Sequence, residues 1–312
     1  MHAPQLFAIM ALTFSTTAVA QSPAIVFVHG RGQEGRSRAE VRQEFVGAFE
    51  RRQREWLGRV IVPAANVGFV WYADAINPGS TQASSVACAS LSSAPVPTEL
   101  NDLRSELMAL AQSLNLDGPA LRLITEDTYR YLSSGQTRCE ADTRLGVELR
   151  ARGFTARPLI LIAHSMGGIV SFASLQQNAQ TLDDSRLYRV ERYVTLGTQL
   201  GTPLILKGIV GSYIQPPVPV PRTIRSWANF KNRGDRLAFD VRNSMKVSDP
   251  SRRPREIMIN APGDRHAIGT YLSNREVLRA ILYPWCRAHS AAGKPAECRR
   301  VEAAGDPVAT TP

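Results

Sequence analysis

The sequence predicts one α/β domain, and three observations support this prediction. The chain has 312 residues, of which 44% are hydrophobic, and this is enough to bury one large core. Short apolar runs typical of buried strands alternate along the chain with longer segments of helical periodicity. The chain contains no internal repeat. We therefore expect one sheet and the helices that cover it to share a single core.

Six segments are predicted to be strands because each is a short, mostly apolar run next to turn-forming residues. In chain order they are Ala24–Val28, Val67–Tyr72, Leu159–Ile162, Tyr188–Leu196, Thr223–Phe230 and Arg255–Asn260. The composition of Leu159–Ile162 is typical of a strand that is buried on both faces. The proline-rich segment Ile214–Arg222 cannot join a central strand, because proline has no N–H to donate, and we interpret it as a surface loop or the edge of a lid.

The helices are predicted from apolar residues at helical spacing. In the segment Glu34–Leu57, Val41, Phe45 and Phe49 fall on one face, which we expect to contact the core. Further helices are expected at Leu100–Leu116, at Leu121–Arg152, from Ile169 onward and at Arg275–Leu282. Residues 74–157 are longer than a simple crossover between strands needs, and the first part carries proline, glycine and serine without periodicity. We expect this region to be an insertion that forms a partial cap.

Ser165 lies at the junction between the strand Leu159–Ile162 and the helix that follows it. A nucleophile on such a sharp turn needs small residues two positions away on each side, because the strand and helix backbones approach closely there. Ala163 and Gly167 meet this requirement. The strand, the turn and the helix together indicate a nucleophile elbow, and the alternative is a serine that only caps a helix.

The first 20 residues have the features of a secretory signal peptide. Leu6–Phe14 is a short apolar stretch, and Ala18-Val19-Ala20 has the small-x-small form of a cleavage site. Cleavage after Ala20 would start the mature chain at Gln21, in the periplasm or outside the cell. The n-region is poor in positive charge, so an uncleaved anchor is the alternative, although the apolar run is short for that role.

Four cysteines fit an exported protein, because disulfides persist in oxidising compartments. We expect Cys88 to pair with Cys139 and Cys286 with Cys298, since each bridge then closes one insertion or tail. The alternative is buried free thiols. The cysteines do not have the spacing of a metal site, and we expect no metal and no organic cofactor.

The net charge of +10 raises the question of a nucleic-acid partner. The 37 basic residues are dispersed over expected helix surfaces, and no set of aromatic residues accompanies the densest pairs, Arg51-Arg52 and Arg252-Arg253. We therefore expect no nucleic-acid partner. A basic surface can still attract anionic surfaces at the periphery.

The residues at these positions resemble the α/β-hydrolase superfamily, specifically its lipase and esterase branch. Three motifs carry the resemblance: His29-Gly30 after the first strand, His164-Ser165-Met166-Gly167-Gly168 at the elbow, and the loop Gly197–Pro203. The resemblance implies a mostly parallel central sheet with helices on both faces, a hydrolase domain at residues 21–285 and a C-terminal tail at residues 286–312. It implies the fold more securely than the substrate.

The resemblance also implies a Ser, acid, His order for the catalytic residues. Downstream of Ser165 the histidines are His266 and His289, and His266 follows the strand at Arg255–Asn260 in the position of the catalytic loop. The acid is expected at Asp235, after the strand at Thr223–Phe230. A local turn pairing is the alternative role for Asp235, and Asp240 and Asp264 remain as alternative acids.

Backbone N–H groups must stabilise the oxyanion. We expect Met166 N–H to be one donor, and the resemblance implies Arg31 N–H as the second. The predicted function is an exported serine hydrolase that cleaves small-molecule, lipid or polymeric carboxylic esters through an acyl-enzyme. The alternatives are an acyltransferase with the same triad and a catalytically silent protein that only binds ligands. Substrate chain length and oligomeric state are left open by the sequence.

Overall fold

The computed structural model describes residues 23–30, 33, 35–76, 88, 102–151, 159–181, 189–210, 217–289 and 293–309. The segment assigned above to a signal peptide, residues 1–20, lies outside these ranges, and so does Arg31. Within the described ranges, no helix is long and apolar enough to cross a membrane.

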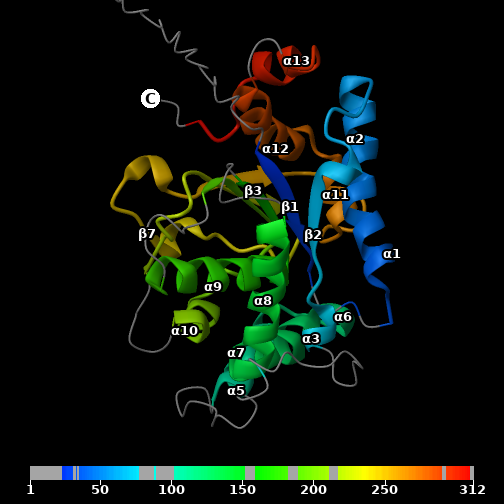
Figure 1. Ribbon diagram of the computed structural model, residues 1–312. Coiled ribbons are helices and arrows are strands. Elements are labelled where there is room, and N and C mark those ends of the chain that lie inside the picture. Colours follow the sequence, from blue (N-terminus) through cyan, green and yellow to red (C-terminus); the bar gives the residue numbers. More distant parts are fainter. Residues whose placement is uncertain are drawn as a thin grey trace, which may run out of the picture.

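The centre of the described fold is a six-stranded sheet in which all paired strands run parallel (Figure 1). Its strands are β1 (Ala24–Val28), β2 (Val67–Val70), β3 (Leu159–His164), β4 (Val190–Leu196), β6 (Trp227–Asn232) and β8 (Arg255–Ile259). They lie in the order β2-β1-β3-β4-β6-β8. The order reverses between β1 and β3, so the loops leaving these strands diverge and form a crevice, where α/β proteins bind their ligands.

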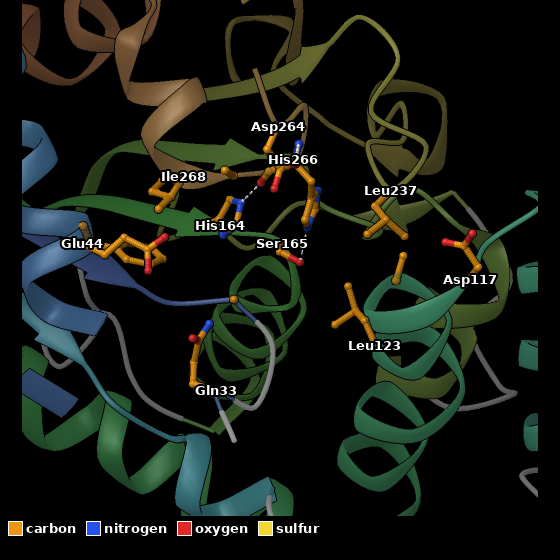
Figure 2. Close-up of a pocket in the computed structure, with 14 residues that line it drawn as sticks. Gln33, Glu44, Asp117, Leu123, His164, Ser165, Leu237, Asp264, His266 and Ile268 are labelled. Carbon is orange, nitrogen blue, oxygen red and sulfur yellow. Dashed lines mark hydrogen bonds between the residues drawn. The ribbon is translucent and has the colours of Figure 1, made fainter. Parts of the chain in front are cut away.

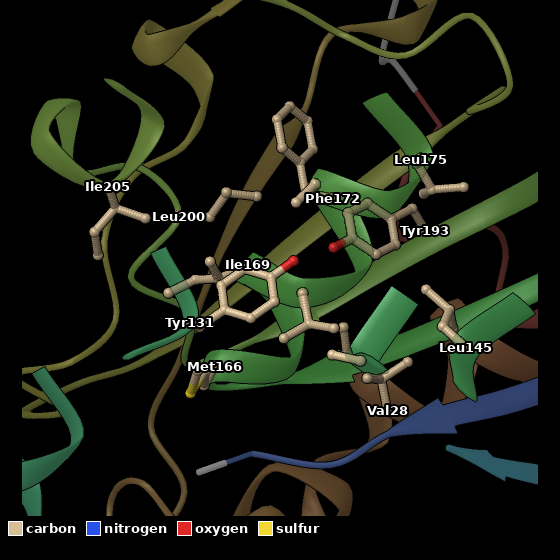
Figure 3. Packing of buried hydrophobic residues seen from close by; sticks show 14 of the residues in the cluster. Val28, Tyr131, Leu145, Met166, Ile169, Phe172, Leu175, Tyr193, Leu200 and Ile205 are labelled. Atoms are coloured by element: carbon tan, nitrogen blue, oxygen red, sulfur yellow. The ribbon is translucent and has the colours of Figure 1, made fainter. Parts of the chain in front are cut away.

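The sheet is buried on both faces, as the apolar composition of its strands predicts. Along β1, Val26 and Val28 pack into one hydrophobic cluster, while Ile25 and Phe27 pack into the other. The first cluster is closed by α3 (Ala73–Ile76), α5 (Leu103–Ser113), α6 (Gly118–Arg122), α7 (Thr128–Ser133), α8 (Gly135–Ala151), α9 (Met166–Thr181) and α10 (Pro203–Val210). Figure 3 shows part of this cluster, in which residues of α9 pack against Tyr131 and Leu145.

The second cluster is closed by helices from both ends of the chain. These are α1 (Arg38–Arg42), α2 (Ala48–Leu57), α11 (Ile268–Ser273), α12 (Arg275–Ala288) and α13 (Cys298–Ala303). Two π-helical turns, η1 (Gln43–Gly47) and η4 (Leu123–Asp127), and three 3₁₀ turns, η2 (Ala64–Asn66), η6 (Arg242–Ser244) and η7 (Pro250–Arg252), complete the described helical elements. A parallel sheet with helices on both faces is the α/β-hydrolase architecture predicted from the sequence.

The predicted proline-rich surface segment lies outside the central sheet. Val218–Pro219 forms strand β5, which pairs with β7 (Met245–Lys246) in a separate two-stranded sheet. Val218 is buried and Pro219 is exposed. This edge position agrees with the inability of proline to donate a hydrogen bond within a central strand.

Two of the long helices differ from the sequence-based expectation. The first begins at Arg38 rather than Glu34, because Ser37 and Glu40 form a capping box: Glu40 N–H donates to Ser37 Oγ, and Ser37 N–H donates to the Glu40 carboxylate. The expected helix at Leu121–Arg152 is divided by Ser134, which has an extended backbone conformation between α7 and α8. Helical spacing of apolar residues does not reveal such short breaks.

Both predicted disulfides are present in the structure. Cys88 is bonded to Cys139 on α8, and Cys286 at the end of α12 is bonded to Cys298 at the start of α13. Each bridge joins segments that lie on the outside of the sheet rather than within it.

The C-terminal residues return to the central strand β4. Arg192 on β4 is 5% exposed and makes two hydrogen bonds with the carboxylate of Asp306, at 3.0 and 2.7 Å. Arg255 on β8 donates to the carbonyl of Ala309. A guanidinium this deeply buried needs a charged partner, because an unpaired buried charge is strongly destabilising.

We expect Gly167→Ala to lower the free energy of unfolding by about 1–3 kcal/mol or more, the usual range for overpacking. A Cβ atom at this position would lie 2.4 Å from the carbonyl oxygen of His29 and 2.6 Å from that of Val28, and backbone atoms cannot move aside easily. Urea denaturation checks the result. Gly269→Ala in α11 is the matched control, because a Cβ there meets no atom within 4 Å. Equal stability of the two variants would contradict the steric explanation.

Candidate active site

Ser165 lies between the end of β3 and the start of α9, directly at the crevice in the sheet. Its φ is +54°, in the left-handed region that a serine rarely adopts. The strained turn is held by a hydrogen bond from Ser165 N–H to the carbonyl of Leu196, at 2.8 Å. Such a turn exposes the side-chain oxygen of the residue at its tip while the backbone stays packed.

The elbow fits only because its neighbours are small. Gly167 lies against the backbone of His29, and a Cβ on Gly30 would lie 3.2 Å from the Cβ of Ser165. The loop after β1 and the elbow are therefore in contact. This close approach explains why small residues flank Ser165 in the sequence.

Ser165 is linked to His266 and Asp235 by a chain of hydrogen bonds (Figure 2 shows the first link). Ser165 Oγ lies 2.9 Å from His266 Nε2, and His266 Nδ1 lies 2.9 Å from Asp235 Oδ2 and 3.1 Å from Oδ1. A carboxylate accepts only, so Nδ1 carries the imidazole proton and the Nε2 lone pair faces the serine. This arrangement allows the imidazole to remove the serine proton.

The three residues come from loops that leave the carboxyl ends of β3, β6 and β8 in the same sheet. Asp235 lies in the turn after β6, and His266 lies in the loop between β8 and α11. The side chain of Asp235 is 1% exposed, whereas that of His266 is 26% exposed. The acid is thus shielded from water, while the imidazole lines the cavity.

The alternatives considered from the sequence make other contacts. Asp240 forms an ion pair with Lys231, and Asp264 accepts the backbone N–H of His266 rather than a ring proton. His289 Nδ1 hydrogen bonds with the carbonyl of Trp285 at the end of α12. The structure brings His266 and Asp235 to Ser165, and it does not bring His289 or Asp240 there.

His164, next to Ser165 in the chain, contacts the main chain of His266. Its Nε2 lies 2.7 Å from the carbonyl oxygen of His266, so Nε2–H donates to this carbonyl. Burial above all, and the nearby His266 ring, lower the pKa of His164 to about 3. His164 is therefore neutral at ordinary pH and holds the backbone of the loop that carries His266. This role has no signature in the sequence.

We expect the neutral His164 to make the fold sensitive to acid. A histidine in the unfolded chain has a pKa of about 6.5, so below this pH the unfolded state takes up a proton that the native state excludes until about pH 3. The free energy of unfolding should then fall by up to about 1.4 kcal/mol per pH unit from this group. His164→Asn should show a shallower decline in urea denaturation between pH 7 and pH 4. Parallel stability profiles for the two proteins would refute this expectation.

The loop after β1 is ordered by Tyr72. Tyr72 N–H donates to His29 Nε2 at 3.1 Å, and the Tyr72 hydroxyl lies 2.8 and 2.6 Å from the carbonyl oxygens of His29 and Gly30. The two rings also stack, with centroids 4.1 Å apart. Both nitrogens of His29 are used within this loop, because Nδ1 hydrogen bonds with the Gly30 carbonyl. His29 thus organises the loop and is not available as a base.

Of the two backbone N–H groups expected to stabilise the oxyanion, the structure describes that of Met166 but not that of Arg31. Met166 begins α9 directly after Ser165, and N–H groups in the first turn of a helix have no partner within the helix. Arg31 lies outside the described residues. Gly30, which precedes it, lines the cavity beside Ser165.

A cavity of about 380 Å³ opens beside Ser165 and His266. Its apolar lining consists of Phe45, Ala120, Leu123, Leu237, Ala267 and Ile268, and its polar lining includes Gln33, Glu44, Asp117 and Asp264 (Figure 2). Asp117, Ala120 and Leu123 belong to the inserted region at residues 74–157, which therefore supplies one wall. The lining residues were not identified from the sequence, because only the packing of distant segments brings them together.

Both π-helical turns contribute to the lining. Glu44 and Phe45 lie in η1, and Leu123 lies in η4. In Figure 2, Glu44 and Leu123 are on opposite sides of Ser165. A π-turn inserts one extra residue into a helix and shifts the direction of the side chains that follow, and such turns occur frequently at functional sites. The two turns set the directions in which Phe45 and Leu123 face the cavity.

Among the described residues, no group of three or more His, Cys, Asp or Glu side chains is arranged to hold a metal ion.

No family model matches the chain, and no curated protein matches it. Among solved structures, the chain is similar to EstE1, a thermophilic and thermostable carboxylesterase cloned from a metagenomic library. The two share 13% identity over 86% of this chain and 80% of that chain, with a TM-score of 0.34. The evidence for a function therefore lies in the geometry of the site itself.

Proposed function

We propose that the protein is an exported serine hydrolase that cleaves carboxylic esters through an acyl-enzyme intermediate. The observation that supports this proposal best is the chain of hydrogen bonds from Ser165 Oγ through His266 to Asp235. A hydroxyl attacks an ester only when a base takes its proton, and a base needs a fixed tautomer to do so. The strained φ of Ser165 supports the same reading, because strain of this kind is concentrated at functional sites.

In the proposed reaction, Ser165 Oγ bonds to the ester carbonyl carbon while its proton moves to His266 Nε2. Asp235 stabilises the resulting imidazolium. The tetrahedral intermediate then collapses, the bond to the alcohol breaks, and the imidazolium gives its proton to the leaving oxygen. Water repeats the sequence on the acyl-enzyme and releases the acid. His266 is thus first a base and then an acid in each half-reaction.

The negative charge on the carbonyl oxygen requires donors that are fixed before the reaction. We assign this role to the backbone N–H groups of Met166 and Arg31. The position of Met166 at the start of α9 supports the first assignment, because the positive end of the helix dipole also faces the developing charge. The hydrogen bonds from Tyr72 to the loop after β1 would keep the second donor in place.

The lining of the cavity favours an ester with a short apolar acyl group. Phe45, Leu123 and Ile268 present apolar surface, and the volume of about 380 Å³ lies near the lower end of the range for ligand pockets. Glu44, Asp117 and Asp264 also line the cavity, and carboxylates at the rim disfavour a substrate that carries negative charge.

A fluorophosphonate probe and a series of p-nitrophenyl esters test the proposal. We expect the probe to label wild-type protein at Ser165 and to leave Ser165→Ala unlabelled. Hydrolysis should be fastest for short acyl chains and should decline as the chain lengthens. Product analysis with an added alcohol separates hydrolysis from acyl transfer. If the wild-type protein neither reacts with the probe nor cleaves any ester of the series, the proposal is wrong.

We expect the mature protein to begin at Gln21 and to contain no free thiol. The two disulfides support export, because such bonds are kept in oxidising compartments. Intact mass measurement of the protein recovered from its native compartment reports the cleavage site, and thiol titration under denaturing, non-reducing conditions reports the cysteines. Four reactive thiols would contradict the proposed location.

A further inference from the structure

Tyr271 on α11 contacts the acid of the proposed triad from a position that is buried beneath the site. The residue is 0% exposed, and its hydroxyl lies 2.6 Å from Asp235 Oδ2. The same hydroxyl accepts the backbone N–H of Asn232 at 3.1 Å. Tyr271 lies five residues after His266, so the short segment that carries the base also carries this contact to the acid.

The direction of this hydrogen bond is fixed by its surroundings. A tyrosine hydroxyl has one proton to donate, and here its oxygen already accepts the N–H of Asn232. The proton therefore points to Asp235. Burial above all, followed by the charge of Asp235, raises the pKa of Tyr271, so the hydroxyl keeps its proton at neutral pH.

The Asp235 carboxylate has three donors, and each constrains it differently. Leu237 N–H donates to Oδ1 at 2.9 Å, Tyr271 donates to Oδ2, and His266 Nδ1 faces both oxygens. The bonds from Leu237 and Tyr271 lie on opposite oxygens, so together they stop rotation of the carboxylate about its Cβ–Cγ bond. With only one of them, the carboxylate could turn away from the imidazole.

Gly197 at the end of β4 provides the space for this contact. Its φ is +59°, and a Cβ there would lie 2.8 Å from Asp235 Oδ2 and 2.9 Å from the Tyr271 hydroxyl. Any larger residue would separate the two groups or push them from β4. Glycine adopts this left-handed conformation without steric cost, and it also leaves room for the pair.

We propose that Tyr271 is a positioning residue for the triad: its hydroxyl holds the Asp235 carboxylate in the orientation in which it accepts the Nδ1 proton of His266. This inference rests on the proposed function, because it assigns a role within the same triad. Tyr271 does not touch the substrate. It acts through Asp235, and through Asp235 it sets the tautomer and the basicity of His266.

Tyr271→Phe tests the inference, because it keeps the buried ring and removes only the hydroxyl. We expect kcat to fall about tenfold, which corresponds to one hydrogen bond to a charged group, while KM stays unchanged. Without this donor, the carboxylate turns away from the ring for part of the time and stabilises the imidazolium less, so the imidazolium loses its proton at lower pH. The acid limb of the kcat/KM profile should therefore move to lower pH. A purely structural role would reduce the amount of folded protein without moving this limb.

Two further variants make the test specific. Tyr131→Phe is the matched control, because Tyr131 is also fully buried and its hydroxyl also contacts a carboxylate, that of Asp142 at 3.5 Å. This control should keep the wild-type pH profile. Incorporation of 3-fluorotyrosine at position 271 retains the hydroxyl and should keep kcat near the wild-type value.

The outcomes separate the inference from the function on which it rests. If Tyr271→Phe has the wild-type kcat and pH profile while Ser165→Ala is inactive, the role of Tyr271 is disproved. The proposed hydrolase function is not contradicted by that result. If Tyr131→Phe moves the acid limb as far as Tyr271→Phe does, the effect is not specific to Asp235 and the inference also fails. If the wild-type protein has no esterase activity at all, the proposed function itself has failed.

Discussion

Ser165→Ala is expected to lower kcat for ester hydrolysis on the order of 10⁶-fold, because the nucleophile and its base act as one unit. The variant should fold normally. Alanine removes only the hydroxyl, and the hydrogen bond from the backbone N–H of residue 165 to Leu196 does not depend on the side chain. Steady-state kinetics with a p-nitrophenyl ester measures the loss, and thermal denaturation verifies the fold.

Ser171→Ala is the matched control for this experiment. Ser171 lies on the same helix, α9, but its hydroxyl is buried against Tyr193 and the carbonyl of Gly167. We expect this variant to keep most of its activity and to lose some stability, because it removes a buried hydrogen bond. Activity of Ser165→Ala within tenfold of the wild-type value would rule out Ser165 as the nucleophile.

Asp235→Asn is expected to lower kcat about 10⁴-fold with little change in KM, the loss seen when a triad histidine is held in the wrong tautomer. The structure gives the reason. Leu237 N–H donates to one oxygen of Asp235 and the Tyr271 hydroxyl donates to the other. Asparagine has a single side-chain oxygen, so an NH₂ group replaces one of the two oxygens. His266 Nδ1 lies within 3.1 Å of both oxygens, so this NH₂ group can donate to Nδ1. The ring must then carry its proton on Nε2, directed at Ser165.

The neighbouring aspartates are the controls for the acid. Asp240→Asn should lose only the exposed ion pair with Lys231, and Asp264→Asn should retain an oxygen that can accept the His266 N–H. Both are expected to stay near the wild-type kcat. If either variant is inactive while Asp235→Asn is active, the acid has been assigned to the wrong residue. The assignments of Ser165 as nucleophile and His266 as base are not affected by that result.

The strands and the elbow could be predicted from the sequence because their causes are local. A strand buried on both faces must be mostly apolar, as β1 and residues 159–163 of β3 are. A strained turn beside another backbone must have small neighbours, as Ser165 has. The order Ser, acid, His along the chain then limited the candidates for the acid and the base to a few residues. The proximity of Asp235 and His266 to Ser165 in the structure follows from the parallel sheet, which brings the loops after β6 and β8 to the same edge.

The contacts that support the site could not be predicted in this way. Tyr271 belongs to no motif of the sequence, and its contact with Asp235 depends on the packing of α11 against the turn after β6. The π-turns that direct Phe45 and Leu123 into the cavity are equally hidden, because an extra residue in a helix changes the spacing by less than the pattern can resolve. Long-range packing therefore determines the shape of the cavity.

The ion pair between Arg192 and Asp306 makes the central sheet depend on a segment distant in the sequence. Arg192 is on a central strand, and its partner lies 114 residues later in the chain. Without Asp306, the guanidinium that β4 must bury has no counter-charge, so the finished sheet is disfavoured. The sheet and the segment after α13 therefore fold and unfold as one cooperative unit.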